Sequence, residues 1–536
     1  MKNYPLFKVP QIKTIRELCE YAIVEYADKQ AYSYFLGEKL IKHTFKEAMG
    51  EVRYLATALL EKGYTDGTKI AVVGKNSYLW CITYLAVLAS GNVIVPLDKD
   101  LDEKTMKKLL TNSDSKAIIY DYEYEDMFGS YDKLETISMK GELGRIIAHG
   151  EDVYKKSSEL YKKVDIDSEA TAAIIYTSGT TGEPKGVCLS NRSIVMNVVH
   201  ANELVDLKGG TVLILPLHHT YAILGSFLSP ILKGINCHIN SSLKNVLPDI
   251  QAGKPYYICV VPLYIESFNK SIWANAKKSG KEGILKNLIK ASNQMRRAKI
   301  DLRRRLFASV LKAFGGNLEL LVCGGAPMQE AMYEAFDNFG ISVIEGYGIT
   351  ECSPLVSVNR VKYFRKRSVG LVCKDNEVRI FDMDDNGEGE ICVRGDIVMN
   401  GYYKNKKATD EVLKDGWFST GDIGYIDDDG FLFITGRKKN LIITSTGKNI
   451  HPEELEELIL TNIKGVLEVV ITGDDKKIYA EIYKDPDLKS LTEKQIEDAI
   501  DEFNKTLPVY KRVNKVKFRD TEFTKTTTKK IKREYK

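Results

Sequence analysis

The densest group of phosphate-binding side chains in this 536-residue chain lies between residues 176 and 186. This stretch combines four Thr or Ser hydroxyls, three glycines and a lysine, and it separates two apolar runs typical of buried strands. Glycine lets backbone N–H groups turn toward an anion, while hydroxyls and an ammonium group supply further donors. The sequence predicts a polyphosphate site made of Thr177, Ser178, Gly179, Thr180, Thr181, Gly182 and Lys185. The spacing differs from that of the P-loop, so the P-loop fold is not implied.

Three further segments hold side chains suited to the rest of a nucleotide. Residues 320–327 form a strand candidate that ends in a Gly-Gly turn, where a flat ring could approach the backbone. Residues 345–351 place a tyrosine, a threonine and a glutamate close together. Either segment alone is also typical of a tight turn. Residues 415–424 contain Asp422, whose carboxylate can accept from two hydroxyls at once.

In order and spacing, these segments resemble the adenylate-forming superfamily, which includes acyl-CoA synthetases, firefly luciferase and nonribosomal-peptide adenylation domains. The resemblance covers essentially the whole chain and is strongest to long-chain fatty acyl-CoA synthetases, notably at residues 346–354 and 415–440. It implies an acid–thiol ligase that uses ATP, Mg²⁺ and coenzyme A. The predicted product is an acyl-CoA formed through an acyl-adenylate.

The same resemblance assigns roles to the motif residues. Thr350 would contact the α-phosphate, and Glu351 would hold Mg²⁺ together with Thr180. Asp422 would bind the ribose, and Arg437 would reinforce the ribose or phosphate contact. The adenine would lie against Gly325, Ala326, Pro327, Tyr347 and Gly348.

The basic C-terminal tail resembles the superfamily's lysine loop, Pro-Lys-Thr-x-x-Gly-Lys-Ile-x-Arg. From residue 511 to 536 it has eleven Lys or Arg against three Asp or Glu. Alignment places the catalytic lysine at Lys530, which would bridge the carboxylate and the α-phosphate. Thr524 and Lys529 stand where the family has Pro and Gly, so Lys529 competes for the catalytic role.

Two more positions follow from the resemblance. Lys439 aligns with the interdomain hinge, where many relatives have Asp. His219 aligns with an aromatic-or-His position beside the acyl pocket, although the adjacent His218 leaves the assignment open. Amino-acid-activating relatives usually carry an Asp near residues 260–268, where this chain has only Glu266, so an amino-acid substrate is disfavoured.

The arrangement of apolar runs predicts an α/β fold. Short β-branched runs alternate with helical stretches, which favours parallel sheets covered on both faces. After residue 370, Gly- and Asp-rich hairpins predict a small β-barrel-like part. We expect an AMP-binding N-terminal domain over residues 1–438 and a smaller, mobile α+β lid domain over residues 439–536. The expected strands are 69–73, 93–95, 117–120, 173–176, 212–215, 258–261, 320–323, 466–472 and 478–483.

Composition narrows the class of protein. An apolar fraction of 44% with 28% charged residues is typical of a globular chain, and a net charge of +4 gives no reason to expect nucleic-acid binding. The uncharged runs 76–97 and 209–232 are interrupted by Gly, Pro or His, so we expect buried core rather than membrane spans. Run 209–232 is also a candidate wall for a lipid-like chain. No apolar leader opens the chain, and we expect a cytoplasmic protein with, at most, peripheral membrane contact through the arginine-rich region 296–305.

Three functions remain open on the sequence. The first is a ligase that joins a medium- or long-chain fatty acid to CoA. The second is an enzyme that loads an acyl or aryl acid onto a separate carrier protein. The third is a nucleotide-binding regulator without turnover, which would follow if Lys529 disables the tail.

Overall fold

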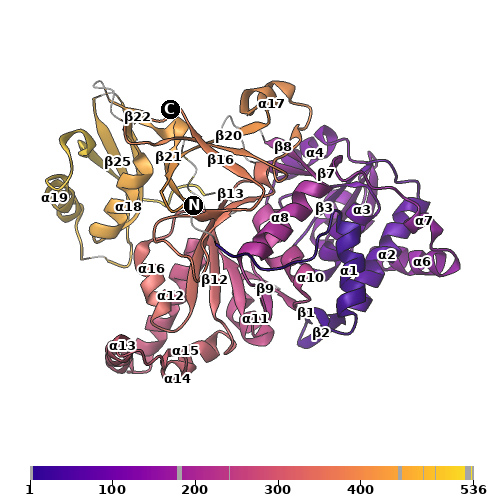
Figure 1. Ribbon diagram of the computed structural model, residues 1–536, viewed down its shortest axis with the longest axis horizontal. Coiled ribbons are helices and arrows are strands. Elements are labelled where there is room, and N and C mark those ends of the chain that lie inside the picture. The colour runs from indigo at the N-terminus through magenta and orange to yellow at the C-terminus, as the bar shows by residue number, and fades with distance from the viewer. Residues whose placement is uncertain are drawn as a thin grey trace.

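The computed structural model describes residues 4–177, 184–240, 242–444, 449–474, 476–488 and 490–525, together with Ile531 and Arg533. A large part built around two sheets occupies most of the molecule, and a smaller part formed by the last hundred residues lies at one end (Figure 1).

The first sheet is parallel at its centre. The expected strands at 69–73, 93–95 and 117–120 occur there as β3, β4 and β5, and short helical connections keep them parallel. Its strand order is β18 (Gly401–Tyr402), β8 (Lys185–Ser190), β7 (Thr171–Thr177), β4 (Val93–Pro96), β3 (Lys69–Val73), β5 (Ala117–Tyr120) and β6 (Glu135–Ser138).

The side chains of these strands alternate between the two faces of the sheet, which explains why helices cover both faces. Ala71 and Val73 join the cluster that contains Met106 of α4 (Glu103–Asn112). Ile70 and Val72 face the opposite way, into the main core. Successive side chains of a strand point to opposite faces, so apolar residues at every position require a cover on each side. The prediction of a sheet covered on both faces is confirmed for these strands.

One half of the second sheet consists mainly of parallel strands, and the other half consists of antiparallel hairpins. Its order is β16 (Glu377–Phe381), β17 (Gly389–Arg394), β20 (Trp417–Ile426), β21 (Phe431–Arg437), β15 (Gly370–Val372), β14 (Leu355–Val358), β13 (Ser342–Gly348), β12 (Leu320–Gly324), β11 (Tyr257–Val260), β9 (Thr211–Leu213), β10 (Cys237–Ile239), β1 (Gln30–Leu36) and β2 (Lys39–Thr44). The short β19 (Leu413–Lys414) pairs with β20. The antiparallel end, from β14 onward, is where the sequence predicts Gly- and Asp-rich hairpins.

Helices pack around these sheets, and their ends follow local capping signals. Thr44 and Glu47 form a capping box at the start of α2, and Pro262 begins α12. The longer helices of the large part are α1 (Ile15–Tyr26), α2 (Phe45–Glu61), α3 (Tyr78–Ala89), α6 (Glu142–Lys156), α8 (Asn191–Leu204), α11 (Val246–Gly253), α12 (Pro262–Lys278), α13 (Glu282–Arg297), α16 (Glu330–Asp337) and α17 (Lys406–Val412). The shorter α14 (Arg303–Leu306) and α15 (Ala308–Ala313) follow α13.

The two uncharged runs are interior elements. Run 76–97 forms α3 and β4, and run 209–232 forms β9, α9 (Thr220–Ala222), the π-helix η2 (Ile223–Leu228) and the start of α10 (Ser229–Lys233). Within the described ranges, no helix combines the length and apolar character needed to cross a bilayer.

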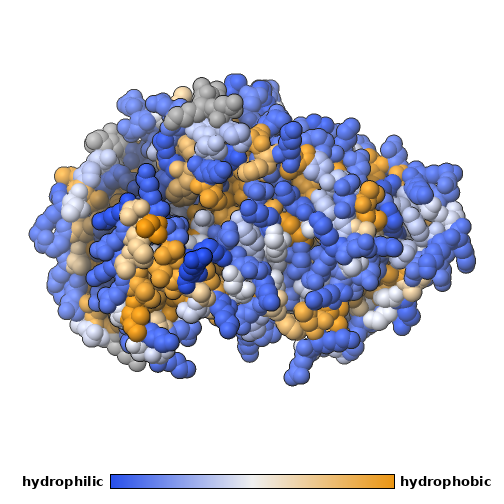
Figure 2. Space-filling model, turned by 60° about the horizontal axis from the view of Figure 1, so that its bottom comes forward, coloured by the Kyte–Doolittle hydropathy of each residue, from blue (hydrophilic) through white to orange (hydrophobic). Residues whose placement is uncertain are grey.

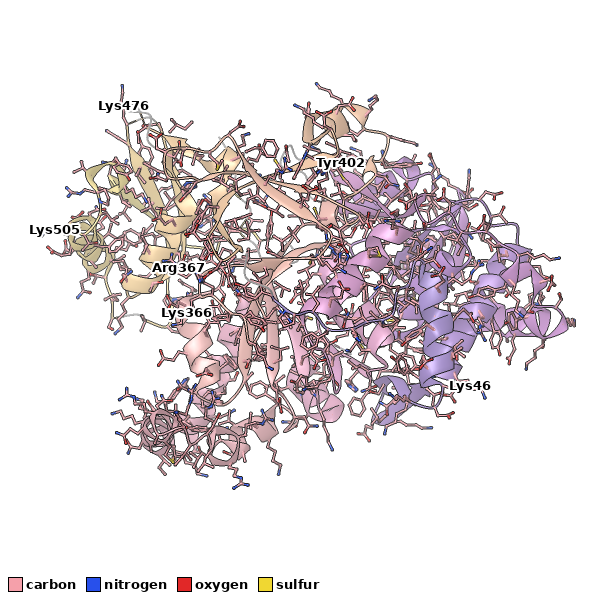
Figure 3. All side chains as sticks on the ribbon, in the orientation of Figure 1. Lys46, Lys366, Arg367, Tyr402, Lys476 and Lys505 are labelled. Carbon is pink, nitrogen blue, oxygen red and sulfur yellow. The ribbon has the colours of Figure 1, made fainter. Side chains whose placement is uncertain are left out.

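The C-terminal part has a core of its own. The strands β24 (Val466–Gly473), β25 (Ile478–Lys484) and β26 (Lys515–Arg519) form a small sheet under α18 (Pro452–Asn462) and α19 (Glu493–Asn504). The short strands β22 (Ile442–Ile443) and β23 (Asn449–Ile450) precede it. Arg367 of the large part lies 3.6 Å from Glu457 of α18, at the junction seen in Figure 3.

Candidate functional site

One cavity of about 2470 Å³ brings together residues from both sheets and from the C-terminal part. The carboxyl ends of β7, β12 and β13 open toward it, which is where α/β sheets commonly bind ligands. The predicted site residues on its wall are Thr177, Lys185, His219, Gly325, Tyr347, Gly348, Thr350, Glu351, Arg437 and Lys439.

The predicted phosphate stretch is only partly described. Thr177 ends β7 and Lys185 begins β8, and the two face each other across the strand pair. Ser178, Gly179, Thr180, Thr181 and Gly182 lie outside the described residues. The ends that carry this stretch therefore border the cavity.

Tyr347 and Arg437 form one network around the buried carboxylate of Asp422. The Tyr347 hydroxyl donates to Oδ2 of Asp422 at 2.6 Å, and Nε of Arg437 lies 2.7 Å from Oδ1. Asp422 faces Arg437 because β20 and β21 pair in that register. Burial, reinforced by the Asp422 charge, raises the pKa of Tyr347, so its phenol stays protonated as a donor. Both carboxylate oxygens expected to meet a ribose are thus held by protein groups in this structure.

Glu351 sits on the short 3₁₀ turn η4 (Thr350–Cys352) that follows β13. The hydroxyl of Tyr402 donates to its Oε1 at 2.8 Å, and Nζ of Lys185 lies 4.9 Å from the Tyr402 ring centre. Figure 3 labels Tyr402 near the first sheet. The arrangement holds a carboxylate and an ammonium group on the same wall of the cavity.

The Gly-Gly turn after β12 leaves room for a close approach. Gly325 has φ +88°, a conformation that side chains rarely adopt, and it lines the cavity. A Cβ on Gly324 would lie 3.4 Å from the Tyr221 ring and from the Gly346 carbonyl oxygen. Ala326 and Pro327 follow this turn but are not part of the cavity wall.

Both histidines of the 218–219 pair reach the cavity, in different environments. His219 is half-buried and precedes α9. His218 is buried, with Nε2 3.4 Å from the Asp98 carboxylate, and desolvation lowers its pKa to about 4. His218 is therefore neutral near pH 7. The structure does not single out one of the two.

Part of the cavity wall is apolar. Run 209–232 contributes Ile214, Leu215, Ala222, Leu224 and Gly225, several of them from the π-helix η2 or its approach. The elements β11, β12 and α12 add Cys259, Val261, Leu263, Tyr264 and Val322 to this wall. Run 209–232 is thus core and cavity wall at once.

The C-terminal part closes the cavity from the other side. Lys525 and Ile531 form an antiparallel bridge, and both line the cavity with Arg533. Lys529 and Lys530 lie between the bridge partners but outside the described residues. Lys439 also lines the cavity, and partial burial together with the guanidinium groups of Arg437 and Arg533 lowers its pKa.

Comparison with known protein families identifies the chain. The family model described as AMP-binding enzyme matches residues 19–403. The chain belongs to the AMP-binding enzyme family. A second model, AMP-binding enzyme C-terminal domain, matches residues 439–535. The predicted resemblance to the adenylate-forming superfamily is confirmed, and with it the prediction of an AMP-forming ligase.

Relatives in this AMP-binding family carry two kinds of name. The long-chain-fatty-acid–CoA ligase FadD15 of Mycobacterium bovis is 31% identical over 464 residues, covering 81% of this chain and 75% of that protein. The chloroplastic long-chain-fatty-acid–[acyl-carrier-protein] ligase AEE15 of Arabidopsis thaliana is 27% identical over 555 residues, covering 87% of this chain and 75% of that protein.

Solved structures share the fold. The anthranilate CoA ligase AuaEII, solved with anthranoyl-AMP, superposes with a TM-score of 0.77 at 20% identity, covering 98% of this chain and 96% of that one. The predicted acyl-CoA synthetase-like α/β class, with a large N-terminal part and a smaller C-terminal part, is confirmed.

Sequence reasoning missed several residues of the candidate site. Tyr402, Lys525 and Arg533 line the cavity, and Tyr402 holds Glu351. Lys525 and Arg533 flank the predicted lysine loop, so the hairpin implied by that loop could have suggested them. Tyr402 is 51 positions from Glu351, and no sequence pattern links the two.

Proposed function

We propose that this AMP-binding enzyme activates a medium- or long-chain fatty acid with ATP and transfers the acyl group to CoA. In the first step, a carboxylate oxygen attacks the α-phosphorus and pyrophosphate leaves. In the second, the CoA sulfur attacks the acyl carbonyl, the thiol proton is lost and AMP leaves. Neither step needs a covalent bond to the protein, so positioning and charge stabilisation supply the catalysis.

One observation carries this proposal: a single cavity is lined both by the nucleotide-type residues and by an uncharged, largely apolar stretch of wall. Tyr347 and Arg437 belong to the first set, and Leu224 and Val261 belong to the second. An acid bound with its carboxylate toward Thr350, which is expected to contact the α-phosphate, would extend its chain along the apolar walls. Burial of each CH₂ group contributes about 0.8 kcal/mol, so such walls favour a long chain over acetate.

The nucleotide roles remain as the resemblance assigns them. Tyr347, Gly325 and the neighbouring backbone would receive the adenine, while Asp422 and Arg437 would bind the ribose. For Asp422 to do so, the ribose hydroxyls must replace or share its present partners. Thr350 and the stretch from Thr177 to Lys185 would contact the phosphates. His219 would border the acid.

Glu351 fits a magnesium site. It offers carboxylate oxygens on the cavity wall, held in place by Tyr402, and Mg²⁺ prefers oxygen ligands from one or two carboxylates plus substrate phosphates. Thr180 would complete the protein ligands. When bound, Mg²⁺ would neutralise charge on the triphosphate.

The C-terminal part, residues 439–536, would act as a lid over the cavity. Lys530 would approach the cavity from the loop between Lys525 and Ile531 and stabilise the α-phosphate charge. A rotation near Lys439 would then remove Lys530 and admit the thiol. Support comes from the described ends of that loop, which already line the cavity.

A separate acyl carrier protein is the second candidate acceptor, because one relative is named as a ligase of that kind. The test is a panel of acids from acetate through palmitate to benzoate, scored by acid-dependent ATP–pyrophosphate exchange. We expect exchange to rise with chain length, and AMP release to require CoA. Exchange without CoA-dependent release would favour the carrier protein. No exchange with any acid would overturn the enzyme and favour a nucleotide-binding regulator.

A further inference from the structure

A chain of polar side chains runs through the interior from β1 to the cavity wall. The Ser33 hydroxyl lies 3.0 Å from Nδ1 of His238, and Nε2 of His238 lies 3.5 Å from Oδ1 of Asp249. Nδ2 of Asn240 then donates to Oδ2 of Asp249 at 2.7 Å. All four side chains are buried. Figure 2 shows hydrophilic side chains over most of the visible face, where polar groups meet water, so a polar chain inside the fold needs another explanation.

This polar chain is not a hydrolytic triad. Ser33, His238 and Asp249 have the residue types of one, but none of these three described residues lines the cavity. A nucleophile must reach its substrate, and Ser33 is only 2% exposed. Asn240, the fourth member, does border the cavity. What the polar chain produces is therefore an amide held in place on the cavity wall.

Asp249 decides which atom of that amide is left for a ligand. A carboxylate accepts hydrogen bonds and cannot donate them, so the NH₂ group of Asn240 must point toward Asp249. The carbonyl oxygen Oδ1 of Asn240 lies on the other side of the amide, and no group in the described part of the chain donates to it. Buried acceptors are nearly always satisfied, so a molecule bound in the cavity is the partner that would supply the hydrogen.

Asn240 lies beside the apolar stretch of the cavity wall. Ile239 is paired with Leu213 in the parallel ladder of β10 and β9, and the backbone N–H of Asn240 donates to the Leu213 carbonyl at 3.2 Å. The residue after Leu213 is Ile214, which lines the cavity together with Leu215. An acyl chain that follows this stretch would pass the amide oxygen of Asn240.

We propose that the Asn240 carbonyl oxygen accepts a hydrogen bond from a hydroxyl group on the acyl chain, so that the preferred acid is a hydroxy acid. This inference deepens the proposed function and rests on it. Asp249 is a positioning residue, because it holds the amide with its acceptor toward the acid. An unsubstituted chain would leave that oxygen without a partner, and a ketone would place a second acceptor against it.

The test compares kcat/KM in acid-dependent ATP–pyrophosphate exchange for palmitate, hydroxypalmitates with the hydroxyl at successive carbons, and the matching oxopalmitates. We expect one hydroxyl position to exceed palmitate by about three- to tenfold, and its oxo counterpart to fall below palmitate. In Asn240→Leu the hydroxyl loses its acceptor, so the order of palmitate and the hydroxy acid should invert. Asn236→Leu, just before β10 and off the described cavity wall, should keep the parent's order.

Two more variants separate hydrogen bonding from folding. Asn240→Leu leaves the buried Asp249 carboxylate with one donor fewer. The double variant Asn240→Leu, Asp249→Leu, checked by thermal unfolding, therefore repeats the comparison with both partners replaced. Asp249→Leu alone frees the amide to turn its NH₂ group toward the cavity, so the oxo acid should gain relative to the hydroxy acid. An equal loss for both acids would overturn the positioning role of Asp249.

Three results would overturn the inference as a whole. They are no hydroxyl position above palmitate in the parent, an unchanged order in both Asn240→Leu and the double variant, or the same inversion in Asn236→Leu. If no acid supports exchange, the proposed function fails. The dissociation constants of the hydroxypalmitates and palmitate, measured by calorimetry on the parent and Asn240→Leu, would then decide the binding preference by themselves.

Discussion

The imidazole Nε2 of His451 lies 3.2 Å from Oε2 of Glu388, so the start of α18 is paired with the β16–β17 hairpin. Both side chains are largely shielded from water. Gly436 makes the contact compatible with the neighbouring strand, because a Cβ there would lie 2.8 Å from Nδ1 of His451. This pair ties the C-terminal part to the large part in the present arrangement.

The first prediction concerns acid stability. The hydrogen bond from His451 lowers the pKa of Glu388 below its usual 4.5, against the opposing effect of burial. A carboxyl whose pKa is lower when folded stabilises the protein above its unfolded pKa, and this stabilisation is lost as the pH falls through the folded value. Urea unfolding should therefore show the difference between parent and Glu388→Gln shrinking as the pH drops below about 4.5. His451→Gln should remove the same pH-dependent difference; a difference that grows on acidification would contradict this.

The second prediction concerns the Tyr347 hydroxyl. Tyr347→Phe removes a 2.6 Å hydrogen bond to a buried carboxylate, which should cost about 1–3 kcal/mol in the free energy of unfolding. We expect ATP to bind roughly tenfold more weakly, because Asp422 loses its orientation. Tyr425→Phe, whose ring stacks on Phe433 in the β20–β21 pair, is the matched control. Unchanged or tighter ATP binding in Tyr347→Phe would show that the hydroxyl competes with the nucleotide.

The third prediction concerns Glu351. Glu351→Gln should lower acid-dependent ATP–pyrophosphate exchange by about 100-fold and raise the Mg²⁺ concentration needed for half-maximal rate. Tyr402→Phe should have a smaller effect, about tenfold, since it only removes the group that holds the carboxylate. Tyr403→Phe is the control, because that hydroxyl donates to Asp114 instead. If Tyr402→Phe and Tyr403→Phe behave alike, Tyr402 does not position Glu351.

The fourth prediction concerns the depth of the apolar end. A Cβ on Gly225 would lie 2.5 Å from Sγ of Cys259. In Gly225→Ala, neighbouring side chains must therefore move into the cavity, or the fold is strained by about 1–3 kcal/mol. We expect kcat/KM for palmitate to fall about tenfold relative to that for a medium-chain acid. Adding Cys259→Ala should restore the ratio by removing the sulfur. An unchanged ratio in the single variant would place the acyl chain elsewhere.

The fifth prediction separates Lys529 from Lys530. Lys530→Ala should abolish acid-dependent exchange while leaving ATP binding and transfer from a supplied acyl-adenylate to CoA intact. Lys529→Ala, one residue away in the sequence, should keep exchange within about threefold of the parent. The reverse pattern would move the catalytic assignment to Lys529.

The sequence predicts the central strands well because each is a short, uniformly apolar run. The expected strand 69–73 coincides with β3, and 117–120 coincides with β5. Strands with weaker apolar character escape prediction. The edge strand β2 has only exposed and half-buried side chains, and β26 is rich in lysine and arginine.

The candidate site is predictable only as far as its motifs extend. The presence of Tyr347, Asp422 and Arg437 follows from motifs, but the bond from Tyr347 to Asp422 depends on how β13 and β20 lie within one sheet. The position of His218 against Asp98 likewise depends on packing between distant elements. Such pairings are set by tertiary structure, and a single sequence carries no record of them.

The undivided cavity has a practical consequence. Because Arg437 and Leu224 border the same space, a molecule that joins an alkyl tail to adenosine through a non-hydrolysable linkage could contact both at once. Its two halves would share one loss of translational freedom, so it should inhibit far more strongly than either fragment. If the tail of such inhibitors is shortened step by step, the length that inhibits most strongly should match the chain length of the natural acid.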